Sequence, residues 1–259
     1  WTMLDREVNR FSKYVGTFAF GWRIILTTGT GSIFGFLVAR EAYATAILAP
    51  LFIVMSLLYG TAVYFLILKT ISKFHKTYIS TDILMNLRRL TIMFLFANLY
   101  FLFLYHITNM YIAKHVEYEI FILSNGGIYT LAFWLGQLLI GIILPIIVIN
   151  SKKLCNELSL IISSILILIG SFVAMYVIII GGQAYPLTIF PDHIIVESSF
   201  YDNTVHSYVP SLYEFGLGLG GVALALIIVL IGIANFKFLP TLIKPPKKKL
   251  PDENENTVA

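Results

Sequence analysis

Six long apolar stretches constrain the fold of this chain more than any other feature of its sequence. A hydrocarbon core about 30 Å thick takes roughly 20 residues of helix, and only helices or closed barrels satisfy their backbone hydrogen bonds there. The chain is 58% hydrophobic and 12% charged, which excludes a soluble domain. We therefore predict an all-α integral membrane protein, a multi-helix transmembrane bundle. The predicted spans are Tyr14–Val38, Thr45–Leu68, Leu90–Ile112, Gly127–Ile149, Leu158–Gly181 and Leu212–Phe236.

Basic residues are divided unequally between the two sides that these spans define. Clusters of lysine and arginine precede the first span, join the second to the third and the fourth to the fifth, and follow the sixth, whereas the other side has only Arg40 and Lys114. Such asymmetry marks the basic side as cytoplasmic. We therefore expect the Thr70–Arg89 loop and the C-terminus in the cytoplasm. Residues 1–240 form the transmembrane domain, and 241–259 form a polar tail with no role in nucleic-acid binding.

The first predicted span differs from the others because it carries a charge, Arg23, and a run of small polar residues from Thr27 to Ser32. Polar groups inside a membrane are costly and usually face other protein segments. We favour a structural pair of Arg23 with a buried acid or with helix-end carbonyls over a role in proton transfer.

Histidine and cysteine are too few for a resident metal cofactor built from this chain. The only cysteine, Cys155, excludes an internal disulfide and an iron–sulfur cluster bound by this chain alone. A membrane haem needs axial ligands inside the bundle, and His106 is the only histidine within a predicted span. We expect no haem and no metal site.

Polar residues that suit a ligand gather at the outer ends of the spans. In the third span Asn98, Tyr105, His106 and Asn109 share roughly one helix face, with the last two at the outer end. Interhelical hydrogen bonding and ligand binding stay open for His106 and Asn109. Gln137 in the fourth span has the same two interpretations. A long polar, aromatic connection between 182 and 211 lies on the same outer side.

Several short motifs have a familiar pattern. The sequence IGGQAYPL covers 180–187, YVPS covers 208–211, and Glu214 then begins a glycine-rich helix. Trp134 and Pro145 follow an outer loop with two glutamates, and an earlier pair of helices has Thr28-Gly29, Pro50, Ser56, Gly60 and Ala62. Together these stretches resemble the NrfD/PsrC family, the membrane subunits of polysulfide-reductase-like, sulfite-reducing and related respiratory complexes.

The resemblance implies properties that the residues alone do not show. Members have eight to ten helices, so this chain, which begins with Trp1, is expected to lack two to four at its N-terminus. The family also implies a quinone site near the outer face, a ferredoxin-like iron–sulfur partner and a further catalytic reductase or oxidase subunit. The expected location is the cytoplasmic membrane of a bacterium or archaeon.

The leading hypothesis is a quinone-reactive membrane anchor subunit of a respiratory oxidoreductase complex, without the catalytic centre for the terminal substrate. It exchanges electrons between menaquinone or ubiquinone and the iron–sulfur partner. Quinone chemistry needs hydrogen-bonding groups at the two ring oxygens and nearby groups that exchange protons. The predicted quinone-binding residues are His106, Asn109, Gln183, Tyr185 and Glu214, with Glu117 and Glu119 as proton-transfer groups.

Two other hypotheses come from different classes. A secondary transporter or proton-translocating module would use Arg23 and the outer acids as an ion path, although no internal repeat of the kind typical of transporters is evident. A purely structural anchor would use the outer loops only to dock a partner.

Overall fold

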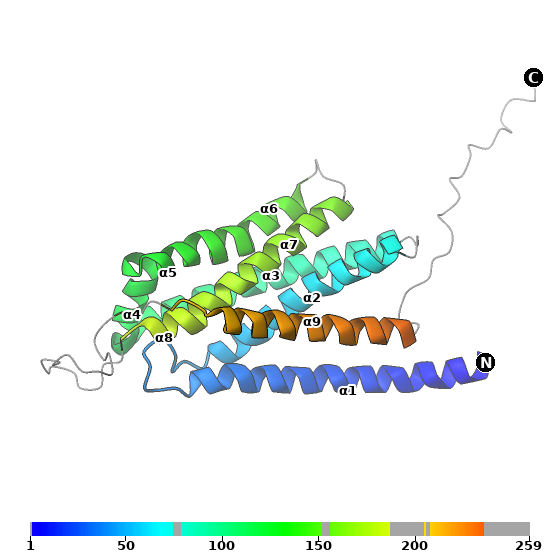
Figure 1. Ribbon diagram of the computed structural model, residues 1–259, viewed down its shortest axis with the longest axis horizontal. Helices are drawn as coiled ribbons and strands as arrows, with labels where there is room; N and C mark the ends of the chain where they lie inside the picture. The colour runs from blue at the N-terminus through cyan, green and yellow to red at the C-terminus, as the bar shows by residue number, and fades with distance from the viewer. Residues whose placement is uncertain (1, 75–78, 152–155, 187–204, 206–207, 236–259) are drawn as a thin grey trace, which may run out of the picture.

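The computed structural model describes residues 2–74, 79–151, 156–186, 205 and 208–235, and its long helices lie roughly side by side (Figure 1). Three begin the chain: α1 (Thr2–Gly35), α2 (Leu48–Phe74) and α3 (Thr81–Tyr111). A short turn, η1 (Ala113–His115), then leads into α4 (Val116–Ile120) and η2 (Phe121–Asn125). The remaining elements are α5 (Ile128–Leu131), η3 (Ala132–Ile143), α6 (Leu144–Asn150), α7 (Asn156–Met175), η4 (Tyr176–Gly181), α8 (Gly182–Ala184) and α9 (Leu212–Asn235).

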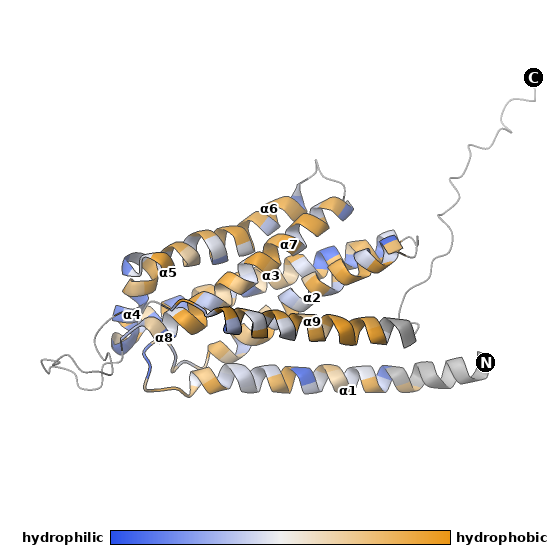
Figure 2. Cartoon of the chain, in the orientation of Figure 1, coloured by the Kyte–Doolittle hydropathy of each residue, from blue (hydrophilic) through white to orange (hydrophobic). Residues whose placement is uncertain are grey.

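The described residues confirm the predicted all-α membrane bundle. Five continuous helices are long and apolar enough to cross a membrane, judged by length and composition. The helix α1 is 34 residues long and packs along α2, yet it is visibly less hydrophobic than the others (Figure 2). It does not meet the same criterion because Arg23 and the Thr27–Ser32 run dilute its apolar residues. The five are Leu48–Phe74, Thr81–Tyr111, Ile128–Asn150, Glu157–Ala184 and Leu212–Gly232.

The second and third helices extend further than the hydropathy of the sequence predicts. The expected Thr70–Arg89 loop is mostly helical, since α2 ends at Phe74 and α3 begins at Thr81. Their charged turns are held by contacts at this end of the bundle. Lys69 forms an ion pair with Glu157 of α7, and Arg88 Nη2 donates to the Ile149 carbonyl of α6, 2.6 Å away. Contacts between polar groups at the end of the bundle can thus stabilise helical turns beyond the apolar part of a helix.

Glycines set the closest helix crossing in the bundle. A Cβ added to Gly170 of α7 would lie 2.1 Å from the Cα of Gly141 in η3, and one added to Gly136 would lie 2.4 Å from Val173. A larger residue at Gly170 would displace the Gly141 backbone, and one at Gly136 would displace the Val173 side chain. The helix formed by α5, η3 and α6 is therefore packed directly on α7.

Two of the long helices contain stretches of π-helical turns, η3 and η4. The first ends just before Pro145, which has no N–H to donate to a preceding turn. Such wide turns expose carbonyls and are frequent at functional sites. Both stretches approach the end of the bundle where α4, α5 and α8 gather, opposite the N-terminus (Figure 1).

The last helix, α9, makes few contacts with the rest of the described chain. No side chain of 212–232 is buried, and a Cβ at Gly216, Gly218, Gly220 or Gly221 would meet nothing within 4 Å. The close helix packing that these glycines suggest therefore has no partner among the described residues. Most of the predicted outer loop and the predicted polar tail lie outside the described residues.

Candidate functional site

A buried carboxylate beside the C-terminal end of α3 is at the centre of the candidate site. After α3 the chain reverses through η1 into α4, which returns Glu119 to the last turns of α3. Its side chain is 1% exposed. One oxygen, Oε1, contacts His106 Nδ1, and the other, Oε2, accepts from Asn109 Nδ2 at 3.2 Å. Both oxygens thus have partners, as a buried carboxylate requires.

The hydrogen-bonded cluster continues to a second histidine. The Nδ1 atom of His115 lies 3.4 Å from Asn109 Oδ1, and both residues are buried. Burial lowers the pKa of His115 below its usual value, and the neighbouring charge of Lys114 lowers it further, while Glu119 opposes the shift. A neutral His115 ring can donate to the Asn109 oxygen and so fix the orientation of that amide.

Two buried polar atoms in this region lack a hydrogen-bond partner among the described residues. They are His106 Nε2 and Gln137 Oε1. The His106 ring lies edge-on to Phe133, with 4.7 Å between ring centroids, and Gln137 follows Phe133 by four residues in η3. Buried polar groups in native proteins nearly always have a partner. The pair therefore fits a polar ligand or an ordered water.

The Glu119 carboxylate can only accept a hydrogen bond from His106 Nδ1. It therefore favours the tautomer of His106 with the proton on Nδ1. The lone pair of Nε2 is then free to accept a hydrogen bond or a proton. A histidine that is held by an acid at one ring nitrogen and has its other ring nitrogen without a described partner is able to exchange protons with a ligand that carries a hydroxyl group.

Tyrosine side chains surround the cluster on its outer side. Tyr185 Oη donates to Glu117 Oε2 at 3.5 Å, and its ring packs against Tyr118 and Phe121, with centroids 5.6 and 5.3 Å away. Burial raises the pKa of Tyr185 to about 12, and the charges of Glu41 and Glu117 add to that shift. Tyr185 therefore remains a hydrogen-bond donor at physiological pH.

The connection between α1 and α2 holds these helix ends together. Tyr43 Oη donates to the carbonyls of Ile178 and Ile179, at 3.1 and 3.0 Å, which the π-helical turn η4 leaves accessible. Tyr105 Oη donates to the Ala42 carbonyl at 2.7 Å. A Cβ on Gly182 would lie 2.8 Å from Tyr43 Oη and 2.9 Å from Ala42 Cβ, so this position requires glycine.

The structure brings His106, Asn109 and Glu119 together, and it joins Tyr185 to Glu117. It does not bring Gln183 or Glu214 to this cluster. Gln183 is exposed, and its carbonyl accepts from Arg40 at 2.8 Å.

Glu214 instead occupies the start of α9, where it accepts hydrogen bonds from the backbone N–H and hydroxyl of Ser211 at 2.7 and 2.9 Å. This is the geometry of a helix cap. Glu117 is not buried, in contrast to Glu119. The two glutamates, which the sequence treats alike, therefore have different environments.

Four residues of this region were not among the predicted site residues: Gln137, His115, Tyr105 and Tyr43. The sequence did indicate Gln137 as a candidate, because an amide in the middle of an apolar span needs a hydrogen-bond partner. Tyr105 lies on the helix face that the sequence pattern indicates, but its partner, the Ala42 carbonyl, does not follow from that pattern. His115 and Tyr43 depend on how α4 and the 36–47 connection fold back, and no local pattern in the sequence indicates that path. In the described part of the chain, no three His, Cys, Asp or Glu side chains are grouped to hold a metal ion.

Comparisons with known proteins identify the family of the chain. Residues 1–186 match the family described as polysulphide reductase, NrfD. The integral membrane subunit of the Hdr-like menaquinol oxidoreductase from Archaeoglobus fulgidus is 25% identical over 237 residues, which is 90% of this chain and 60% of that protein. One subunit of the selenate reductase from Mesobacillus selenatarsenatis is 22% identical over 224 residues, 86% of this chain and 50% of that protein.

This chain thus spans 60% and 50% of the lengths of these two relatives. No solved structure matches it. The family match extends over most of the chain, from the start of α1 to the end of α8. With five apolar helices and the match over 1–186, the chain belongs to the polysulphide reductase NrfD family of multi-pass membrane proteins.

Proposed function

We propose that this chain is the quinone-interacting membrane anchor of an oxidoreductase complex and that menaquinol is the class of quinol it takes. The family match and the two relatives, both subunits of oxidoreductases, support the role of a quinone-interacting membrane anchor. The observation that carries the proposal is the pair of buried polar atoms without partners among the described residues, His106 Nε2 and Gln137 Oε1, beside a buried carboxylate.

In this proposal the quinol is held by groups of complementary character. A quinol hydroxyl donates to His106 Nε2, and a second polar contact is made with the Gln137 amide. Phe133 covers the His106 ring and supplies an apolar wall for a flat aromatic head. Asn109 acts through Glu119, because its amide binds Oε2 and so orients the carboxylate toward His106.

Oxidation of a quinol to a quinone releases two electrons and two protons. His106 accepts the protons in turn at Nε2, and Glu119 stabilises the positive charge that develops on the ring. The electrons pass to an iron–sulfur partner subunit at the outer face, which in turn serves a catalytic subunit. Glu117, which is bound to Tyr185 at the outer side of the cluster, is the proposed point of proton release to water. Gln183 and Glu214 remain predictions for quinone binding.

The test is quinol-linked electron transfer in the assembled complex with His106→Gln and, separately, Gln137→Leu. Loss of one buried hydrogen-bond partner costs about 1–3 kcal/mol, so each variant should lower turnover by about tenfold or more. The control is Arg89→Gln, an exposed position at the opposite end of the bundle. Normal turnover in both site variants would contradict the proposal, whereas loss of turnover together with assembly would favour the structural anchor.

A further inference from the structure

Arg23 lies at a depth where a charge needs a partner. The helix α1 crosses α2 with Gly31 against Ala49, because a Cβ on Gly31 would lie 2.7 Å from the Ala49 Cα. Arg23 is two turns further from this crossing, beside Ser56. With a rise of 1.5 Å per residue, Ser56 is about 12 Å along the apolar span from Leu48. In the predicted arrangement, in which α1 also crosses the membrane, Arg23 is therefore at the level of the hydrocarbon core.

No acid in the described part of the chain pairs with this arginine. Its side chain is exposed, and it makes no ion pair or side-chain hydrogen bond with a described residue. The described acids lie in connections or near the ends of helices, and none lies in the middle of a predicted span. They are Glu41, Asp82, Glu117, Glu119, Glu157 and Glu214, while the side chains of Asp5, of Glu7 and of the acids in 187–204 and 236–259 are outside the described residues.

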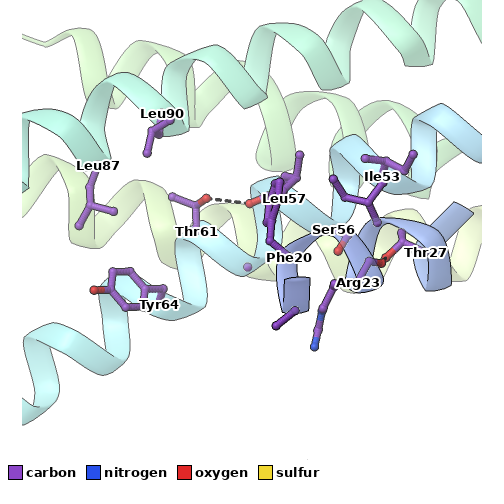
Figure 3. A pocket seen from close by; sticks show the side chains of 13 residues that line it. Phe20, Arg23, Thr27, Ile53, Ser56, Leu57, Thr61, Tyr64, Leu87 and Leu90 are labelled. Atoms are coloured by element: carbon purple, nitrogen blue, oxygen red, sulfur yellow. Dashed lines mark hydrogen bonds between the residues drawn. The ribbon is translucent and has the colours of Figure 1, made fainter. Parts of the chain in front are cut away.

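Two cavities adjoin Arg23 in the groove where α1 crosses α2; the larger is also lined by Leu87 and Leu90 of α3, and the smaller by Met175 of α7. Their volumes are about 620 and 400 Å³, and both are lined by Arg23, Thr27 and Ser56. Figure 3 shows the larger one, which is lined by Phe20 and Arg23 of α1 and by Ser56, Thr61 and Tyr64 of α2. Apart from the arginine its lining is mainly apolar. The groove therefore combines hydrocarbon character with one positive charge that no described acid pairs.

The α2 side of the groove is shaped for another helix. Ser56 and Gly60 are four residues apart and line the larger cavity together, and a Cβ on Gly60 would meet nothing within 4 Å. Small residues at this spacing allow a neighbouring transmembrane helix to approach closely. Thr61 does not compete for such a partner, because its hydroxyl already donates to the Leu57 carbonyl at 2.7 Å.

We propose that the groove between α1 and α2 is the docking surface for a transmembrane helix of another subunit of the complex, and that this helix carries an aspartate or glutamate that pairs with Arg23. A lipid phosphate fits less well, because headgroups lie outside the hydrocarbon core and a snorkelling arginine shortens that distance only in part. Polar contacts between transmembrane helices are the usual way to accommodate such a charge. The helix α9 has an acid only in its first turn, Glu214, and so does not supply the carboxylate.

The first experiment identifies the occupant by photo-crosslinking in membranes that contain the intact complex. A photoreactive phenylalanine analogue replaces Tyr64, which lines the larger cavity and is 53% exposed. The matched control replaces Tyr100, which is 58% exposed on α3 and lines no described cavity. The expected adduct at Tyr64 is a membrane-spanning peptide with a mid-span acid, absent at Tyr100. An adduct with lipid or quinone only, with a second copy of this chain, or none at all would overturn the proposal.

The second experiment is a charge exchange, which separates pairing from folding. Arg23→Glu should lower the yield of intact complex by about tenfold or more, because two carboxylates would then meet in apolar surroundings. Exchange of the identified acid for arginine in the same strain should restore the yield to within about twofold. Arg89→Glu, at the exposed inner end of α3, should leave the yield unchanged. Failure of the exchange to restore the complex, while this chain is still present in the membrane, would refute the pairing.

Discussion

At the scale of single residues, the most informative contact is that between Glu119 and His106. A carboxylate that is 1% exposed is unfavourable unless its oxygens are bound, and here a histidine and an asparagine bind one oxygen each. The same contact leaves Nε2 as the nitrogen of the His106 ring that can bind a ligand or accept a proton. Position in the sequence made Glu119 a candidate for the proton exit, whereas its burial suits a group that holds and orients the histidine.

We predict that Glu119→Gln lowers the turnover of quinol oxidation by about tenfold to a hundredfold, because the developing charge on His106 loses its counter-ion. The KM for quinol should change much less, since Gln can still hydrogen-bond Nδ1. Steady-state kinetics of the assembled complex measure both quantities. The matched control is Asp82→Asn, an exposed acid in the first turn of α3, and equal losses in the two variants would contradict the assignment.

His115 gives the cluster a pH dependence whose sign follows from its burial. The pKa of His115 is lowered from the usual 6.5, so the unfolded chain binds more protons than the folded chain as the pH falls through that value. Stability should therefore be fully present above about pH 7 and decrease below pH 6.5. Thermal unfolding at pH 7.5 and 5.5 checks this. His115→Gln should show a smaller decrease over that interval, and an unchanged decrease would assign the effect to other groups.

At the scale of secondary-structure elements, hydropathy predicted the number and order of the helices but not their full lengths. Apolar composition indicates which residues lie in the hydrocarbon core, and it is silent about charged turns beyond it. The helix α2 continues past Leu68, and α3 begins before Leu90. Both extensions are stabilised at the end of the bundle opposite the candidate site, where Lys69 pairs with Glu157 and Arg88 binds the Ile149 carbonyl.

The candidate site could be predicted only in part, for a similar reason. His106 and Asn109 share a helix face, which the periodicity of one helix is enough to show. Glu119 reaches them only because the chain reverses at η1, and Tyr105 and Tyr43 take part only because the 36–47 connection packs inward. These are tertiary contacts across separate segments. Gln183, which a sequence motif favours, contributes its carbonyl to Arg40 and leaves its side chain exposed.

The crossing of η3 and α7 allows a test of packing at this scale. We expect Gly170→Ala to destabilise the folded protein by roughly 1–3 kcal/mol, because the added methyl group meets the Gly141 backbone and the helices must separate. The thermal stability of the detergent-solubilised protein measures the effect. Gly21→Ala on α1 adds the same group where nothing lies within 4 Å, and it should be neutral or stabilise the helix by up to about 1 kcal/mol. A similar loss in both variants would indicate a general effect of helix glycines.

At the scale of the whole molecule, the two ends of the bundle differ in chemistry. The end with α4, α5 and α8 contains the His106 cluster and the proposed quinol site. The opposite end contains the basic turns of α2 and α3, with Lys69, Lys73, Arg88 and Arg89. The predicted orientation rests on these same basic residues, and in it the candidate site faces outward. A polar quinone head and its redox partner would then meet at one membrane surface.

The orientation itself is the final prediction. Lysine and arginine near the ends of spans are retained in the cytoplasm, so a reporter that is active only in the cytoplasm should be active after Lys248 and inactive after Asp202, positions outside the described residues. The two fusions differ by one crossing, α9, which passes the criteria for a membrane span. A third fusion after Val38 tests α1, whose charge and small polar residues make it the least apolar of the long helices. Inactivity there would show that α1 crosses the membrane and that Arg23 lies within it. Activity at both Lys248 and Asp202 would mean that α9 does not span, and activity after Val38 would remove the depth on which the pairing of Arg23 depends.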